Sequence, residues 1–357
     1  MNSSLLEEFF RTLPNPESFA GKNLYVWGIS NWSRCYQEGL AREKSLNICG
    51  YTVSKNYLGG GGYFCGKKIF SPQEVAADKN AFVLICALNP EALKNIHAEL
   101  HSLNVQYCNI DAAIFSLHKG ELRQVINYLD DERSREIYLS LLQHRARAEL
   151  FVDDCASWDH SFVNPAFQRI NSNDIFVDCG AYVGDTLEKF IWQHEGQLRK
   201  IIAFEPDPKN RRALEKRVIR LCEEWNFSPE TITVYPYGVS NESSVSYLSR
   251  SGNSGAASSI ASVPGSESEE IRTVALDDFL SEGFTFLKAD IESYEYKMLL
   301  GAAKTIKKFK PRLAICIYHN ATDFWSIPLM VKDMCPDYKL IIRHHSTKLV
   351  DTLLYAW

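Results

Sequence analysis

Long apolar runs are missing from this sequence of 357 residues, and no stretch approaches the roughly 20 apolar residues of a membrane-spanning helix. The chain begins without a cluster of basic residues, and Glu7 and Glu8 lie where the apolar part of a signal peptide would run. An excess of positive charge is also absent, because the net charge is -5. We therefore expect a cytoplasmic protein whose main partner is neither a membrane nor nucleic acid.

Paired cysteines are missing as well. The ten cysteines are scattered, and no two have the C-x-x-C spacing that is typical of zinc and redox sites. Several, such as Cys86 and Cys316, lie inside apolar runs that read as strands. This pattern predicts buried free thiols in a reducing compartment.

The length of the chain exceeds what one hydrophobic core usually serves. Residues 23–44 and 174–195 each read as an apolar strand, a tight glycine turn and a helix, and another strand candidate follows each of them. Strands that alternate with helices predict parallel α/β sheets. The predicted fold class is therefore α/β, with a Rossmann-like domain at 1–120, a helical connector at 121–164 and a second Rossmann-like domain at 165–357.

The second domain contains seven strand candidates, at 175–178, 200–204, 231–235, 285–290, 312–318, 338–344 and 350–356. The link between the last two is too short for a parallel crossover, so we expect a mostly parallel sheet that ends in an antiparallel hairpin. Residues 240–270 are rich in Ser and Gly and form either a disordered excursion or short extra strands. In the first domain, Gly59 to Gly62 predict a mobile loop.

The segment VDCGAYVGDT, residues 177–186, carries the strongest local signal. Asp178 ends a strand, Gly180 and Gly184 flank a turn, and Thr186 lies at the start of a helix. Glycines let the backbone approach a ligand closely, and a helix N-terminus favours a carboxylate or phosphate. The order D-x-G-x-x-x-G differs from the G-x-G-x-x-G of dinucleotide sites.

A second acidic residue supports a nucleoside ligand. Glu205 ends the next strand, 27 residues after Asp178, where a carboxylate can accept hydrogen bonds from both ribose hydroxyls. The carboxylate of Asp178 would repel a pyrophosphate and suits a ligand with an ammonium group. This favours S-adenosylmethionine over NAD or FAD, although acidic residues also cap turns.

Four ionisable residues are candidates for catalysis. Lys288, Asp290 and Glu292 alternate along a strand and its end, which places them on one face, and His319 ends the next strand. Ionisable groups at the carboxyl ends of strands beside a ligand site favour function. The structural alternative is a surface Lys paired with Asp, a helix-capping Glu and a His with a structural role.

The glycine turn, Glu205, the segment from Lys288 to Glu292 and His319 follow one another along the chain. In this order they resemble the FkbM-type family of S-adenosylmethionine-dependent methyltransferases over roughly residues 170–357. The matching segments are FVDCGAYVGDT, AFEPDP, YGVSN and LKADIESYEYKMLLGA; in the last, Ser293 replaces a glycine of the family pattern and Glu295 keeps its final acid. The resemblance implies a class I methyltransferase fold and O-methylation, often of sugar hydroxyls or natural products. The cofactor-binding residues that it implies are Asp178, Gly180, Tyr182, Gly184, Asp185, Thr186, Glu205, Pro206, Asp207, Val239, Ser240 and Asp290.

The N-terminal half looks like the Rossmann-like domain that precedes the methyltransferase domain in some relatives. VWGISNW resembles a nucleotide-binding turn written G-x-G-x-W, but Ser30 replaces the second glycine, and GYTVSKN lacks the acidic residue often found there. This half either holds a nucleotide-linked sugar or serves as a scaffold or dimerisation domain, so a homo-oligomer is one expectation.

Methylation of a hydroxyl needs a positioned base or a metal, since a sugar hydroxyl is barely ionised at pH 7. Our hypothesis is that His319 is the base, and that Asp290 and Glu292 orient it or a sugar-like acceptor. The rival is that the three residues share a divalent metal, for which oxygen ligands suit Mg²⁺ better than Zn²⁺. Two other functions stay open, a nucleotide-sugar-binding protein that has lost catalysis and an NAD-dependent oxidoreductase.

Overall fold

A computed structural model describes residues 3–54, 62–157, 170–250, 258–261 and 268–357. The chain divides into two compact units. The first contains Met1–Ala156, Tyr318–Trp325 and Ser346–Asp351, and the second contains Ser157–Ile317, Ser326–His345 and Thr352–Trp357. Most of the predicted glycine loop and the end of the predicted connector lie outside the described residues; of the four glycines, Gly62 begins a strand.

The first unit is built on a six-stranded sheet in the order β3-β4-β2-β1-β5-β6. Only the pair β3–β4 is antiparallel. Apart from Asn23, the residues of the core strands β1 and β5 are apolar or aromatic and buried, because both faces of a parallel sheet are covered. The strands are β1 (Asn23–Trp27), β2 (Ile48–Thr52), β3 (Gly62–Phe64), β4 (Lys67–Phe70), β5 (Ala81–Ile85) and β6 (Gln106–Asn109).

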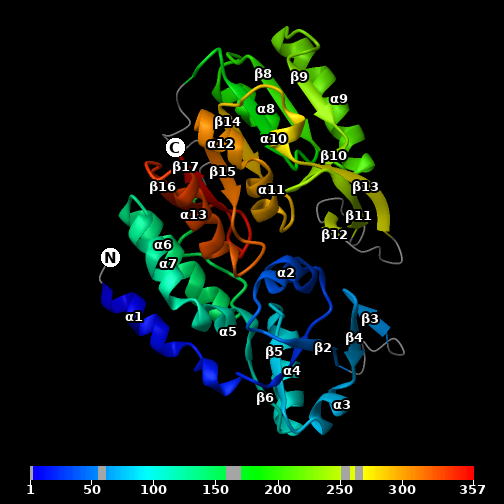
Figure 1. Ribbon diagram of the computed structural model, residues 1–357, viewed down its shortest axis with the longest axis vertical. Coiled ribbons are helices and arrows are strands. Elements are labelled where there is room, and N and C mark those ends of the chain that lie inside the picture. The colour runs from blue at the N-terminus through cyan, green and yellow to red at the C-terminus, as the bar shows by residue number, and fades with distance from the viewer. Residues whose placement is uncertain (1–2, 55–61, 158–169, 251–257, 262–267) are drawn as a thin grey trace. The chain divides into compact units, whose positions relative to one another are not determined.

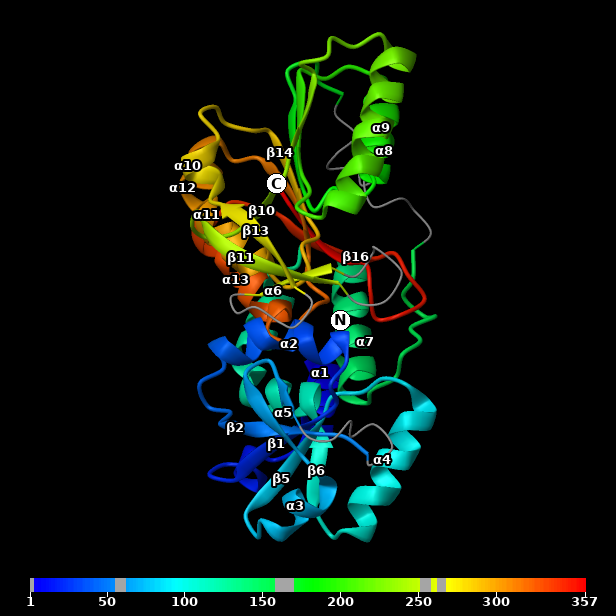
Figure 2. The same ribbon diagram turned by 90° about the vertical axis from the view of Figure 1, so that its right-hand side faces the viewer.

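Helices α2 and α4 lie on opposite faces of this sheet (Figure 2). The start of α4 follows from its sequence, because Asn89 accepts a hydrogen bond from Ala92 N–H as the N-cap and Pro90 has the φ that a first helical residue needs. The predicted helical connector contains α6 and α7, which belong to this unit. The helices are α1 (Ser3–Thr12), the 3-10 helix η1 (Pro16–Ser18), α2 (Asn31–Arg42), α3 (Pro72–Ala77), α4 (Pro90–Ser102), α5 (Ile110–Leu117), α6 (Lys119–Tyr128) and α7 (Glu132–Ala146).

The second unit contains a seven-stranded sheet in the order β16-β17-β15-β14-β7-β8-β9. Strand β17 is antiparallel to both β15 and β16, and the other pairs are parallel. This is the predicted mostly parallel sheet with a terminal hairpin. The strands are β7 (Ile175–Cys179), β8 (Lys200–Phe204), β9 (Ile232–Tyr235), β14 (Phe286–Ala289), β15 (Arg312–Cys316), β16 (Leu340–His344) and β17 (Thr352–Ala356).

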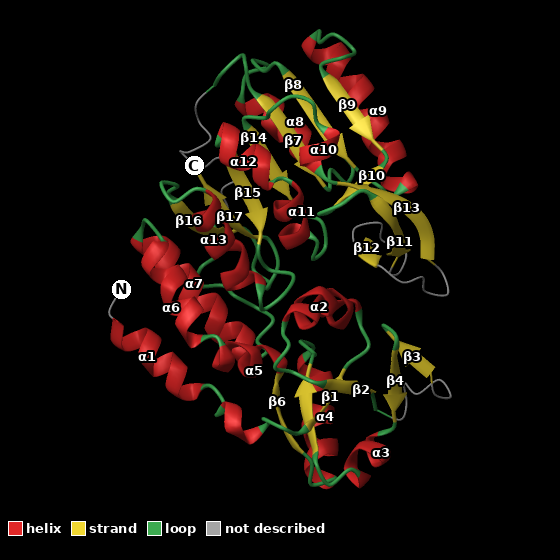
Figure 3. Cartoon of the chain, in the orientation of Figure 1, coloured by secondary structure: helices red, strands yellow, loops and turns green. Residues whose placement is uncertain are grey.

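Helices cover both faces of the seven-stranded sheet (Figures 1 and 3), with α8 and α9 on one face and α10, α11 and α12 on the other. Their ends follow local signals, since Asp207 caps α9, Pro208 opens it and Asn226 ends it in the left-handed region with φ 52°. The helices are α8 (Asp185–Gln193), α9 (Pro208–Trp225), α10 (Leu276–Phe279), α11 (Glu295–Gly301), α12 (Ala303–Phe309) and α13 (Asp323–Met334).

The Ser- and Gly-rich region forms short extra strands where it is described. They are β11 (Ser244–Arg250), β12 (Ser258–Ala261) and the start of β13 (Ser268–Val274). Together with β10 (Tyr237–Val239), which precedes the region, they form a sheet in the order β10-β13-β11-β12. Residues 251–257 and 262–267 lie outside the described part of the chain. Among the described residues, no helix combines the length and the apolar character needed to cross a membrane.

Candidate active site

The glycine turn after β7 lies at the carboxyl edge of the sheet, as its sequence predicts. Gly180 and Gly184 have φ of 79° and 82°, a region that L side chains rarely adopt. A Cβ on Gly180 would lie 2.0 Å from the carbonyl oxygen of Asp290, so only glycine lets this turn approach the end of β14 so closely. Gly184 is the N-cap of α8, and no side chain caps this helix N-terminus in the described part of the chain.

A buried ion pair between Lys288 and Asp178 stabilises the glycine turn after β7. Lys288 lies opposite Asp178 in the β14–β7 register, and its Nζ is 3.1 Å from Oδ1 of Asp178. The same ammonium donates a hydrogen bond to the carbonyl of Gly180 at 2.8 Å. Burial lowers the pKa of Lys288, but the carboxylates of Asp178 and Asp290 raise it by more, so Lys288 stays charged. The observed contacts of Lys288 therefore anchor the turn, and its catalytic role stays a prediction.

Glu205 follows β8, the strand next to β7, and is 6% exposed. Its Oε2 accepts a hydrogen bond from the backbone N–H of Tyr182 at 2.8 Å, and its Oε1 accepts one from the N–H of Asp207 at 2.8 Å. The N–H groups of Gly180 and Ala181 both donate to the carbonyl of Phe204, the residue before it. The predicted ribose-binding carboxylate and the glycine turn thus form one hydrogen-bonded site.

The electrostatics of Glu205 differ from those of a surface carboxylate. Burial raises the pKa of Glu205 to about 7, although the N–H groups of Asp207 and Tyr182 oppose the rise. A carboxyl group with a pKa near neutral pH can exchange between acid and anion in the working range. Each carboxylate oxygen has further lone pairs for a ligand hydroxyl.

Several of the other predicted binding residues of the second unit form hydrogen bonds within that unit or are buried in it. Asp207 is fully buried and caps α9 by accepting from Lys209 N–H at 2.7 Å, while Ser240 N–H donates to Val274 O at 2.9 Å. Tyr182 is 37% exposed and has φ 49°. The remaining members are half-buried or buried in the same unit, namely Asp185, Thr186, Pro206, Val239 and Asp290.

The turn after β14 is strained. Glu292 and Ser293 have φ of 53° and 84°, two consecutive non-glycine residues in the left-handed region, and the family pattern has glycine at the second position. The buried carboxylate of Glu295 supports the turn, because its Oε1 accepts from Ile291 N–H at 2.8 Å. Outliers of this kind concentrate at functional sites. The role of Glu295 in holding this turn is absent from the predicted site.

His319 is 3% exposed and packs against the ring of Tyr318, with ring centroids 4.0 Å apart. It lies in the segment Tyr318–Trp325, which belongs to the first unit, whereas Lys288, Asp290 and Glu292 belong to the second. A shared role for His319 and the two carboxylates, as a base with its partners or as metal ligands, therefore stays a prediction.

The turn between β1 and α2 in the first unit corresponds to the glycine turn between β7 and α8. Its side chains form hydrogen bonds with the N-terminus of α2. Ser30 caps α2 by accepting from Ser33 N–H, and the Ser33 hydroxyl accepts from Ser30 N–H in return. These bonds occupy N–H groups that a helix N-terminus would otherwise offer to a phosphate. This differs from α8, whose N-cap is the glycine Gly184.

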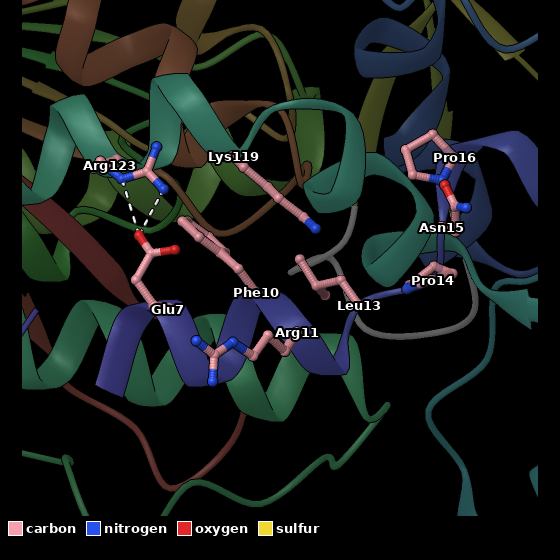
Figure 4. A pocket seen from close by; sticks show the side chains of 9 residues that line it. All are labelled: Glu7, Phe10, Arg11, Leu13, Pro14, Asn15, Pro16, Lys119 and Arg123. Atoms are coloured by element: carbon pink, nitrogen blue, oxygen red, sulfur yellow. Dashed lines mark hydrogen bonds and ion pairs between the residues drawn. The ribbon is translucent and has the colours of Figure 1, made fainter. Parts of the chain in front are cut away.

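Two surface hollows lie away from the predicted site residues, none of which lines either of them. One has a volume of about 330 Å³ and is lined by residues of α1, η1, α6 and the chain between α1 and η1 (Figure 4). The other has about 560 Å³ and lies near the starts of β7, β14 and β15. The candidate site therefore rests on the carboxyl edge of the sheet and not on these hollows.

The strand order and the mostly parallel pairing of the second unit are those of a class I methyltransferase fold. The family model described as the methyltransferase FkbM domain matches residues 178–347. Residues 178–347 of this protein therefore form a methyltransferase FkbM domain. A search of curated proteins finds no match to the chain.

Solved structures resemble the chain in fold. The methyltransferase FkbM from Methylobacillus flagellatus KT is 20% identical, with a TM-score of 0.57 over 99% of this chain and 93% of its own. An rRNA methylase from Streptococcus thermophilus is 15% identical, over 52% of this chain and 87% of its own, with a TM-score of 0.32. Fibrillarin from Aeropyrum pernix, in complex with S-adenosyl-L-methionine, is 11% identical, over 53% of this chain and 68% of its own, with a TM-score of 0.33. At these identities the first likeness shows the fold alone.

Proposed function

We propose that this protein is an S-adenosylmethionine-dependent O-methyltransferase that acts on a hydroxyl of a sugar, a nucleotide-sugar or a related small molecule. The observation that supports it most is the position of Glu205, whose buried carboxylate joins the glycine turn through Tyr182 N–H at 2.8 Å. A carboxylate at this place suits the two hydroxyls of a ribose. The uncapped start of α8 suits the carboxylate of the methionine part.

The residues present fit such a cofactor. Tyr182 is 37% exposed beside Glu205 and offers a ring to the nucleoside. Asp290 follows β14 at the same edge, and its N–H donates to Cys179 O, which keeps it beside the glycine turn. When bound, S-adenosylmethionine supplies a methyl group made electrophilic by its sulfonium.

The chain's own residues must then orient the acceptor and take its proton. In the proposed reaction an imidazole nitrogen of His319 would accept the proton of the acceptor hydroxyl. The hydroxyl oxygen would gain the methyl group as the methyl–sulfur bond of the cofactor breaks, which would leave a neutral thioether. Asp290 and Glu292 would orient the acceptor by accepting hydrogen bonds from its other hydroxyls. A sugar-like acceptor suits these carboxylates because it offers several hydroxyl donors.

The first experiment is calorimetric titration of the full chain with S-adenosylmethionine and, separately, with NAD. We expect binding of the methyl donor alone. Glu205→Ala should weaken that binding by about 1.5–3 kcal/mol for each charge-assisted hydrogen bond lost. Glu282→Ala is the matched control, since it removes a carboxylate that pairs with Lys200 at 3.1 Å and that is no part of the site. Binding of NAD alone would overturn the proposal.

The acceptor class and the chemistry need a second assay. Methyl transfer from radiolabelled S-adenosylmethionine would be measured against a panel of sugars and nucleotide-sugars, with and without a chelator. Full activity of His319→Ala would eliminate this residue as the base. Loss of activity on exhaustive chelation, restored by Mg²⁺, would favour the metal in its place.

A further inference from the structure

The segment Tyr318–Trp325, here named the His319 segment, follows β15 in the middle of the methyltransferase sheet. Although it lies within the matched family domain, it packs as part of the first unit together with Met1–Ala156. Its contacts with that unit are specific and numerous.

Arg42, the last residue of α2, makes the first of these contacts. Its guanidinium donates to the hydroxyl of Thr322 at 2.7 Å and to Oδ1 of Asp323 at 2.8 Å. The other carboxylate oxygen of Asp323 accepts from the backbone N–H of Asn320 at 3.2 Å and from its side-chain amide at 3.1 Å. Arg42 thus holds Asp323, and Asp323 holds the residue that follows His319.

Two further side chains hold backbone carbonyls of the segment. Arg145 of α7 donates to Tyr318 O at 2.7 Å, directly before His319. The hydroxyl of Tyr138 donates to Phe324 O at 2.7 Å. Arg145 is 1% exposed and is itself fixed by an ion pair of 2.9 Å with Asp111. A buried, paired guanidinium has little freedom, so it gives the segment a rigid partner.

Close packing accompanies the hydrogen bonds. A Cβ on Gly39 in α2 would lie 2.8 Å from Oδ1 of Asn320 and 2.9 Å from the hydroxyl of Thr322, so the helix touches the segment along its backbone. The imidazole of His118 stacks on the indole of Trp325, with centroids 4.3 Å apart. The segment is therefore held at both ends and in its middle.

We infer that the N-terminal unit is a positioning device for His319, and that Arg42 is its positioning residue. Taking His319 as the base rests on the proposed function, whereas the contacts that hold the segment do not. A general base acts only from hydrogen-bonding distance, and a misplacement of about 1 Å can cost about a hundredfold in rate. A loop after a strand keeps such accuracy only if other elements fix it, and here residues far away in the sequence do so.

Three variants of the full chain test the inference, namely Arg42→Ala, Arg42→Lys and Arg123→Ala. Arg42 is only partly buried, so its loss should leave the unit folded. Arg123→Ala is the matched control, because it removes an ion pair of the same unit, to Glu7 at 2.6 Å (Figure 4), that does not touch the segment.

Hydrogen–deuterium exchange of the peptide covering 318–325 gives the first readout. We expect Arg42→Ala to raise its exchange by about tenfold or more, the change that follows from losing one charge-assisted hydrogen bond. Arg42→Lys should restore much of the protection through its charge, and Arg123→Ala should change nothing there. Unchanged exchange in Arg42→Ala, or an equal rise throughout the first unit, would overturn the inference.

The imidazole signals of His319 in protein labelled with ¹⁵N-histidine give the second readout, assigned by comparison with His319→Gln. In Arg42→Ala they should shift or double, while the signals of the histidines that do not contact the segment stay. Gly39→Ala provides an independent variant, because Ala favours the helix while its methyl group displaces Asn320. It should move the His319 signals while the far-UV circular dichroism of the protein stays unchanged.

Neither readout needs an acceptor, so the positioning inference is tested even where methyl transfer fails. Titration with S-adenosylmethionine separates the two ideas. Wild-type protein that does not bind the cofactor contradicts the proposed function and leaves the exchange result valid. Cofactor affinity that falls by more than about twofold in Arg42→Ala would show that Arg42 does more than hold the segment.

Discussion

The pKa of Glu205 predicts how nucleoside binding depends on pH. Only the ionised carboxylate accepts hydrogen bonds from both ribose hydroxyls, and burial raises its pKa to about 7. At pH 6 about one tenth of the protein then carries the anion, compared with nearly all of it at pH 9. We therefore expect affinity to be about tenfold weaker at pH 6 than at pH 9, and to level off above pH 8.

The assay is titration calorimetry from pH 5.5 to 9 at constant ionic strength, with 5′-methylthioadenosine as the ligand. This nucleoside keeps the ribose hydroxyls but has no amino or carboxyl group, so its own charge does not change over this range. Binding below pH 7 should release a proton, seen as a dependence of the heat on the buffer. In Glu205→Gln the affinity should be weaker and independent of pH. An affinity of the wild type that is constant between pH 6 and 8 would refute the reasoning.

The same pKa has a consequence for stability without ligand. Because the folded protein holds the proton of Glu205 up to about pH 7, and the unfolded chain releases it near 4.5, stability is lost as the pH rises between these values. The full difference corresponds to about 3 kcal/mol at the usual 1.36 kcal/mol per pH unit. Urea unfolding of wild type and Glu205→Gln, compared at pH 4.5 and 8, isolates this group, and a difference between them that does not change with pH would contradict it.

Further predictions concern the turn beside this carboxylate. Lys288→Met should lower the free energy of unfolding by roughly 3–5 kcal/mol, since it leaves the fully buried Asp178 without its cation; a loss below about 1 kcal/mol in urea unfolding would argue against a buried pair. Gly180→Ala should cost at least about 2 kcal/mol, because its Cβ meets the carbonyl of Asp290 at 2.0 Å. Gly120→Ala in α6, which has no atom within 4 Å of the added Cβ, should instead gain up to about 1 kcal/mol, and equal effects of the two would refute the steric argument.

The sheet of the second unit could be predicted well because its signals are local. Apolar runs bounded by glycine, proline and charged residues mark the seven strands, and the short link before β17 excludes a parallel crossover. The predicted strands 285–290 and 312–318 extend beyond the observed Phe286–Ala289 and Arg312–Cys316. Ile317 explains why the predicted strand 312–318 is too long at its end. It is fully buried although the strand ends at Cys316, and an apolar sequence pattern indicates burial and not strand geometry.

The sequence predicts the position of a site residue only where that residue lies at the end of a strand. Asp178, Glu205 and Asp290 each follow or end a strand, so their common edge follows from the topology. The pairing of Lys288 with Asp178 could not be predicted, because it depends on β14 lying beside β7, two strands that more than 100 residues separate. The alternation of side chains along the strand places Lys288 on the same face as the site. It does not show that the ammonium of Lys288 forms an ion pair with Asp178.

Binding of a nucleotide-linked sugar stays a prediction for the N-terminal unit. Its first turn resembles a nucleotide-binding turn, yet the Ser30–Ser33 capping box occupies N–H groups at the start of α2. The other end of the same helix carries Arg42, whose contact with Asp323 spans 281 positions of the chain. No periodicity or local spacing encodes such a contact, because each residue reads as an ordinary surface charge in its own segment. In this unit the sheet and helices are those of a Rossmann-like fold, while the contacts to which we assign a function lie at the end of α2 and not at its start.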